Sequence, residues 1–261
     1  MKHLTAIFAL IFLLLPLAAL GQTGSASQPS AIKVAAAISL KECLTQAAAT
    51  HRQQTGGDVE LTFGSSGQLL AQIKSGAPVD LFISAADAQV DELIEQKLAD
   101  GSTRKVIAGN QLVLILPKDS KDTIDSLESL ADSRIRKLAI GEPKTVPAGQ
   151  YAMQVIKKLK LQEALRDRLV YGASVRQVLD YVIRGEVSAG IVYSTDAKQA
   201  GEKVKLAATA KASLHDPIRY TAVIIGASKH GEEAKRFRDV LVTPAAQQMF
   251  QKLGFTPAEA K

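Results

Sequence analysis

The chain has 261 residues, of which 46% are hydrophobic and 5% aromatic, so it can form one large or two modest domains with aliphatic cores. Its formal charge of +6 is spread along the chain without a basic run interleaved with aromatic residues, which argues against nucleic-acid binding. Cys43 is the only cysteine, which excludes a disulfide within the chain and a cysteine-based metal site.

The first residues have the pattern of a secretory signal peptide. Residues 1–3 carry positive charge, residues 6–20 are almost wholly apolar, and small residues at 19–21 fit a cleavage site. The apolar run is shorter than a typical membrane span. We therefore expect a cleavable signal peptide over 1–21, a flexible leader over 22–30, and a periplasmic protein. No cysteine near the cleavage site can accept a lipid anchor, so we expect the protein to be free.

The next segment alternates short apolar runs with amphipathic patterns. The runs predict strands at 32–36, 59–63 and 81–83, and the patterns predict helices at 39–53, 67–75 and 87–98. Strands that alternate with helices in this way form parallel sheets with helical crossovers. Cys43 falls on the apolar face of the first helix, where we expect it to pack as a small hydrophobic residue.

A second α/β series follows the first. Its pattern predicts strands at 111–116, 137–140, 169–171 and 189–193, with helices at 151–161 and 175–184. A last strand is expected at 220–225, before helices at 231–242 and 244–253. The natural division is into two α/β units, and Gly109-Asn110 is the best candidate for one crossing between them.

Five breaks of small or hydroxyl-bearing residues stand between an apolar run and a helical pattern. They lie at Ala36-Ala37-Ile38-Ser39, Phe63-Gly64-Ser65-Ser66-Gly67, Pro143 to Gly149, Gly172-Ala173-Ser174-Val175 and Tyr193-Ser194-Thr195-Asp196. Each break would put backbone N–H groups and a neutral donor at a helix N-terminus, where the unpaired amides and the helix dipole favour an anion. If the five breaks converge on one cleft, they form an oxyanion site.

Each of these residues also has a structural interpretation. Ser39 and Glu42 match a capping box, and so do Ser65 and Gln68, which leaves the Ser66 hydroxyl unused by capping. Ser66 is therefore the better functional candidate of the adjacent pair. Tyr193, at the end of a strand, also fits a half-buried core position.

The sequence favours a binding protein over an enzyme. Residues 63–67 resemble a strand–nucleophile–helix turn, but Gln68 stands where G-x-S-x-G requires its last glycine. No pattern ties Asp196 or His215 to Ser66. The four histidines show no clustered spacing, so we expect no site for a free metal cation, and the usual nucleotide loops are missing. We therefore expect no enzyme activity and no cofactor.

Several segments together resemble the periplasmic molybdate-binding proteins of ABC importers. The similar segments are Ala35 to Leu40, Phe63 to Leu69, Gln72 to Ala85, Val146-Pro147-Ala148-Gly149 and Gly190-Ile191-Val192-Tyr193. The resemblance implies a venus-flytrap fold, with two α/β domains joined by two hinge segments and an oxyanion in the cleft. It predicts domain 1 over 31–109 plus 221–261 and domain 2 over 110–220, with the second hinge near 215–220.

The resemblance also implies a ligand and its contacts. It predicts that molybdate or tungstate is held by the hydroxyl groups of Ser39, Ser66 and Tyr193 and by the backbone at Ala148 and Val175. It further implies a monomer that meets a membrane permease and its ATPase subunit.

The sequence departs from the family pattern at two places in the expected site. Ile38 replaces the usual alanine and could crowd the pocket edge, and Gly67 follows Ser66, so Ser65 remains an alternative donor. Arg176 is expected outside the first contact shell. Another oxyanion such as sulfate, or a receptor in place of the transporter, remains an alternative.

Overall fold

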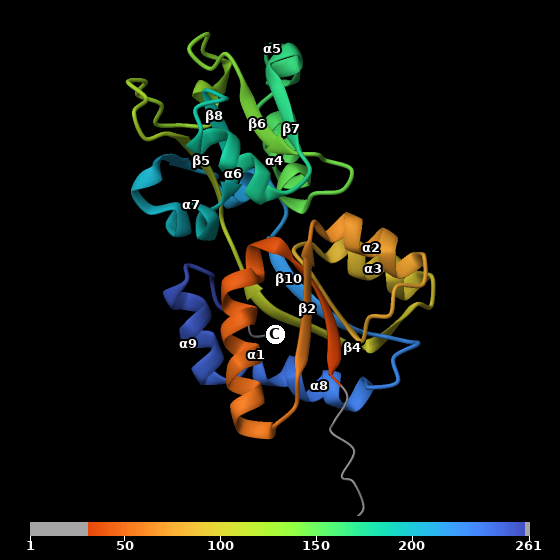
Figure 1. Ribbon diagram of the computed structural model, residues 1–261. Helices are drawn as coiled ribbons and strands as arrows, with labels where there is room; N and C mark the ends of the chain where they lie inside the picture. Colours follow the sequence, from red (N-terminus) through yellow and green to blue (C-terminus); the bar gives the residue numbers. More distant parts are fainter. Residues whose placement is uncertain (1–30, 259–261) are drawn as a thin grey trace, which may run out of the picture.

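The computed structural model describes residues 31–258. The expected signal peptide and leader lie outside the described residues. The described part contains two five-stranded sheets, each covered by helices, which lie one above the other in Figure 1. We call the part with the first sheet the first unit and the part with the second sheet the second unit.

The first sheet has the strand order β2-β1-β3-β10-β4, in which β10 runs antiparallel to both of its neighbours and the other pairs are parallel. Its strands are β1 (Ile32–Ala37), β2 (Val59–Gly64), β3 (Leu81–Ser84), β4 (Ala99–Gly109) and β10 (Arg219–Ile225). Its helices are the 3-10 helix η1 (Ile38–Leu40), then α1 (Lys41–Thr55), α2 (Ser66–Lys74), α3 (Asp87–Glu95), α8 (Gly231–Val240) and α9 (Pro244–Lys252).

The second sheet has the order β7-β6-β8-β5-β9, with β5 antiparallel to β8 and β9. Its strands are β5 (Leu112–Pro117), β6 (Leu138–Gly141), β7 (Leu169–Gly172), β8 (Ala189–Tyr193) and β9 (Val204–Thr209). Its helices are α4 (Pro147–Lys158), α5 (Gln162–Leu165), α6 (Val175–Ile183) and α7 (Ser194–Ala200), with short 3-10 turns η2 (Glu128–Ala131), η3 (Arg166–Arg168), η4 (Gly201–Lys203) and η5 (Ala212–Leu214).

The alternation of side chains along β1 builds a core on both faces of the first sheet. Val34 belongs to the cluster that includes Leu44 of α1 and Phe237 of α8, whereas Ala35 belongs to the cluster that includes Leu69 of α2. Cys43 is buried in the first of these clusters, and its thiol contacts the Leu40 carbonyl. The segments that follow β1 and β2 line one cavity with Val146 and Val175 of the second unit, so the carboxyl ends of these strands face that unit.

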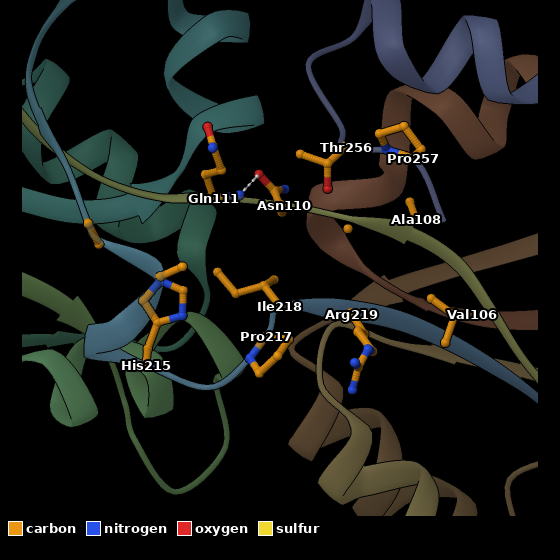
Figure 2. Close-up of a pocket in the computed structure, with 13 residues that line it drawn as sticks. Val106, Ala108, Asn110, Gln111, His215, Pro217, Ile218, Arg219, Thr256 and Pro257 are labelled. Carbon is orange, nitrogen blue, oxygen red and sulfur yellow. Dashed lines mark hydrogen bonds between the residues drawn. The ribbon is translucent and has the colours of Figure 1, made fainter. Parts of the chain in front are cut away.

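The chain crosses between the units twice. The first crossing is Asn110-Gln111, between β4 and β5, and the second runs over 210–218, between β9 and β10. Figure 2 shows residues of both crossings around one cavity of about 290 Å³. Arg219 and Tyr220, which the sequence-based division placed in domain 2, pair with β4 in the first sheet.

Two strands and one α-helix were missed by the sequence analysis. Strands β4 and β9 are edge strands with many exposed positions, so their apolar runs are too weak to detect. Helix α5 is only four residues long, whereas the helix start expected after the break at 193–196 is that of α7. Helix α3 ends at Glu95 rather than at 98, because Lys97 adopts a left-handed φ of 57°. Helix α4 begins at Pro147 rather than at 151.

No described helix is long and apolar enough to cross a membrane. Within residues 31–258, no group of three or more His, Cys, Asp or Glu side chains is placed to hold a metal ion.

Candidate functional site

The five residues expected to contact the ligand meet at one small cavity between the two units. Each is at most 3% exposed. The cavity is lined by Ala37, Ile38, Ser39, Gly64, Ser65, Ser66, Ala85, Val146, Pro147, Ala148, Val175 and Tyr193. The first unit contributes the segments that follow β1, β2 and β3, and the second unit contributes the starts of α4 and α6 and the end of β8. The cavity therefore exists only while the two units are in contact.

Helix N-termini from both units surround the cavity. Ser65 is the N-cap of α2, and Val175 is the first residue of α6. Pro147 begins α4 and has no N–H group, so Ala148 carries the first amide hydrogen of that helix. First-turn amides have no acceptor within their own helix, and the helix dipoles make these ends positive. The arrangement favours an anion without a charged side chain.

Four hydroxyl groups line the cavity, and three of them, on Ser65, Ser66 and Tyr193, donate to no other described group. The Ser66 oxygen accepts a hydrogen bond from the Ala85 N–H at 3.0 Å, so its own proton can still be donated. Ser65 Oγ and the Tyr193 hydroxyl are buried without any hydrogen-bond partner. Burial raises the pKa of Tyr193 well above its ordinary value, so this group keeps its proton. Buried hydroxyls without partners are costly, which indicates that a ligand completes them.

The two expected capping boxes are wrong. Ser39 lies in the turn η1 before α1, and its hydroxyl oxygen lies 2.9 Å from the Tyr220 hydroxyl. Glu42 reaches the second unit instead of the backbone. Ser65 does occupy the N-cap of α2, but its side chain makes no capping bond. Local capping therefore accounts for neither serine, which strengthens both as ligand donors.

Arg176 lies beside Val175 but does not line the cavity. Its guanidinium contacts Glu42 of the first unit at 2.7 Å and Asp196 of its own unit at 2.6 Å. Burial raises the pKa of Asp196 to about 6, although the Arg176 charge opposes the shift. Burial also acts to raise the pKa of Glu42, but hydrogen bonding and charge from Arg176 outweigh it, and that pKa is lowered. Arg176 therefore lies outside the cavity lining, as expected, and is largely buried in an ion-pair cluster that spans the cleft.

Backbone and amide contacts also join the units beside the cavity. The Gly67 N–H donates to the Thr145 carbonyl oxygen at 2.9 Å, and Gln89 donates to Gln150 at 3.4 Å. A Cβ atom on Gly67 would lie 2.6 Å from the Thr145 Cα and carbonyl oxygen. This close approach explains glycine at 67.

The chemistry of the cavity fits a small anion. Among the described residues, no Lys, Arg, His, Asp or Glu side chain lines it. Its volume is about 10 Å³, the scale of a single water molecule, so the cavity must widen before it can hold a tetrahedral oxyanion. Ile38 lines one wall, as the sequence analysis anticipated. The lining provides hydroxyls near backbone donors but no imidazole to activate a serine.

Comparisons with known proteins agree with a binding site for a small anion. A family model described as bacterial extracellular solute-binding protein matches residues 32–256. The chain is 38% identical over 231 residues to the molybdate-binding protein ModA of Escherichia coli, with 86% of this chain and 88% of that protein covered. It is 36% identical over 263 residues to ModA of Haemophilus influenzae, with 98% and 99% covered.

A solved structure extends the comparison to the fold. The periplasmic molybdate-binding protein of Azotobacter vinelandii has a TM-score of 0.79 and 27% identity, covering 87% of this chain and 100% of that chain. This likeness confirms the expected periplasmic binding fold with two α/β sheets.

Proposed function

The chain belongs to the family of bacterial extracellular solute-binding proteins, and we propose that it captures molybdate in the cavity between its two units for an ABC importer. Membership of a solute-binding family confirms that it is not an enzyme. The observation that carries the proposal is the pair of buried, unpartnered hydroxyls of Ser65 and Tyr193 at helix-rimmed walls.

Each expected contact residue has a role in the proposal. Ser39, Ser66 and Tyr193 donate hydroxyl protons, and the backbone N–H groups of Ala148 and Val175 donate from the first turns of α4 and α6. Hydrogen bonds to an ionised acceptor are stronger than neutral ones, typically about 1.5–3 kcal/mol each. Donors from both units can therefore bind a dianion without a buried cation.

The donor set gives a rule for selectivity. An unprotonated tetrahedral dianion such as molybdate or tungstate can accept from every donor. Phosphate near neutral pH keeps a P–OH group, which would face a donor, and each such mismatch costs about 1–3 kcal/mol. We therefore expect phosphate to bind far more weakly than molybdate. Sulfate carries no proton, so only its shorter bonds act against it.

A thermal-shift screen tests the function. Molybdate and tungstate should raise the melting temperature, while chloride and acetate at equal ionic strength should not. A ligand present at 100 times its Kd stabilises the folded state by about 2.7 kcal/mol, so the shift is easily measured. A larger shift with sulfate would favour the alternative anion. The absence of a shift with any of these oxyanions at millimolar concentration would refute the proposal.

The cellular setting follows from the same family. We propose that residues 1–21 direct export, that the mature protein acts as a periplasmic monomer, and that it delivers its anion to a membrane permease with an ATPase subunit. Co-purification with the permease should require the anion, because only the closed form presents both units in one arrangement.

A further inference from the structure

The Ser39 hydroxyl is the end of a buried hydrogen-bond chain that leads to the first crossing between the units. Ser39 Oγ lies 2.9 Å from the Tyr220 hydroxyl, which lies 3.0 Å from Asn110 Nδ2. Tyr220 is fully buried, and Asn110 is nearly so. The chain therefore connects the ligand cavity to the hinge without contact with solvent.

The backbone fixes the direction of this chain. The Gln111 N–H donates to Asn110 Oδ1 at 2.8 Å, the bond drawn in Figure 2, so the amide nitrogen of Asn110 must face Tyr220. That nitrogen can only donate, which makes the Tyr220 oxygen its acceptor. Tyr220 has one proton, and its other hydrogen-bond partner is the Ser39 hydroxyl, so the tyrosine donates to the serine. The Ser39 proton is then left for the cavity.

The Asn110 amide is locked by two further bonds. Its second amide hydrogen is donated to Thr195 Oγ1 at 3.0 Å, and its oxygen also accepts from Ser194 Oγ at 2.9 Å. All four hydrogen-bonding positions of the amide are therefore used, by groups from both units. A flipped amide would set a donor against the Gln111 N–H, which disfavours reversal of the chain.

We propose that Tyr220 and Asn110 are positioning residues that hold Ser39 as a donor and thereby disfavour oxyanions that carry a proton. The inference rests on the proposed function and adds residues to it that do not line the cavity. A protonated oxyanion needs an acceptor opposite the oxygen that carries its proton. Ser39 is a poor acceptor for that proton, because Tyr220 already occupies one of its two lone pairs and its own proton is left for the ligand.

A double-mutant cycle on molybdate binding tests the chain. Tyr220→Phe keeps the ring that packs at 5.3 Å against Phe255 but removes the proton donated to Ser39. We expect it to weaken molybdate binding about tenfold, and to change binding by less than about twofold in a Ser39→Ala background. Thr195→Val is the matched control. It removes the hydroxyl that accepts from the same Asn110 amide nitrogen, but it leaves the hydrogen bonds from Asn110 through Tyr220 to Ser39 intact.

Selectivity provides the second readout. Hydrogen arsenate is tetrahedral and carries a proton near neutral pH. The ratio of its Kd to the Kd for molybdate should therefore fall about tenfold in Tyr220→Phe and stay constant in Thr195→Val. A purely structural role for Tyr220 would weaken both anions equally and act identically in both Ser39 backgrounds, which would overturn the inference. Failure of the wild-type protein to bind molybdate would instead overturn the proposed function.

Discussion

Gly67→Ala should separate the stability of the protein from its ability to close on a ligand. Gly67 lies in the first turn of α2, and its φ is not positive, so alanine suits the local backbone. Alanine is favoured over glycine in helices by up to about 1 kcal/mol, and the unliganded protein should therefore be as stable as the wild type or more so. In the closed form, however, the added Cβ would lie 2.6 Å from backbone atoms of Thr145.

The cost of that contact can be bounded. Backbone atoms on both sides cannot rotate away, and overpacking of this kind costs about 1–3 kcal/mol. Displacing Thr145 would also weaken the hydrogen bond from the Gly67 N–H, a contact that contributes about 1 kcal/mol. The combined cost is about 1–4 kcal/mol, so the Kd for molybdate should rise by roughly 5- to 700-fold.

Calorimetry and small-angle scattering together check this expectation. Molybdate should reduce the radius of gyration of the wild-type protein and reduce it less in Gly67→Ala. Gly231→Ala is the matched control, because Gly231 begins α8 of the same unit and a Cβ there would meet only an Ile224 methyl at 3.8 Å. An unchanged Kd and full compaction in Gly67→Ala would refute the idea that this contact belongs to the liganded form.

Three further perturbations follow from the site. Ser65→Ala removes an unpartnered hydroxyl and should weaken molybdate binding without lowering the unfolding free energy. Ser66→Ala also leaves the Ala85 N–H without its acceptor and should destabilise the unliganded protein by about 1–3 kcal/mol in urea titrations. Glu42→Gln should weaken molybdate binding by less than about tenfold and reduce its salt dependence in calorimetry, because the lost ion pair is partly exposed. The pKa of Asp196 is raised to about 6, so between about pH 4 and pH 6 the folded state holds a proton that the unfolded state has lost. The unfolding free energy should therefore fall by on the order of 3 kcal/mol as the pH rises through this window. The Asp196→Asn variant should lack this pH dependence.

The sequence predicts those parts of the molecule whose signals are local. Strand β8 and residues 34–37 of β1 are continuous apolar runs because helices cover both faces of their sheets, and the position of Cys43 follows from helical periodicity. The five breaks could be located because each combines a strand end with a helix start. Their convergence could not be derived from periodicity, since it depends on how the two sheets face each other, and only the family resemblance supplied it.

The sequence fails where a distant partner outweighs a local one. Ser39 and Glu42 have the spacing of a capping box, yet Tyr220 and Arg176 lie far away in sequence and bind them instead. Arg176 reads as a solvated helix residue because its partners come from two other helices. Strand β4 gives no apolar pattern in the sequence because many of its polar side chains face solvent, and within the sheet it pairs only with β10.

The same magnitudes indicate why closure should depend on the ligand. The direct contacts across the cleft are individually weak: the partly exposed ion pair to Glu42 contributes about 0–1 kcal/mol, and neutral hydrogen bonds such as those from Gly67 and Gln89 contribute about 1 kcal/mol each. Closure without a ligand also buries the Ser65 and Tyr193 hydroxyls without hydrogen-bond partners, which costs about 1–3 kcal/mol for each group. A bound dianion reverses that cost, because it turns every unmet donor into a charge-assisted hydrogen bond. The buried Arg176 cannot replace the anion in this role, since two carboxylates already neutralise it. Neutral donors with incomplete partners thus make the anion itself the group that holds the two units together.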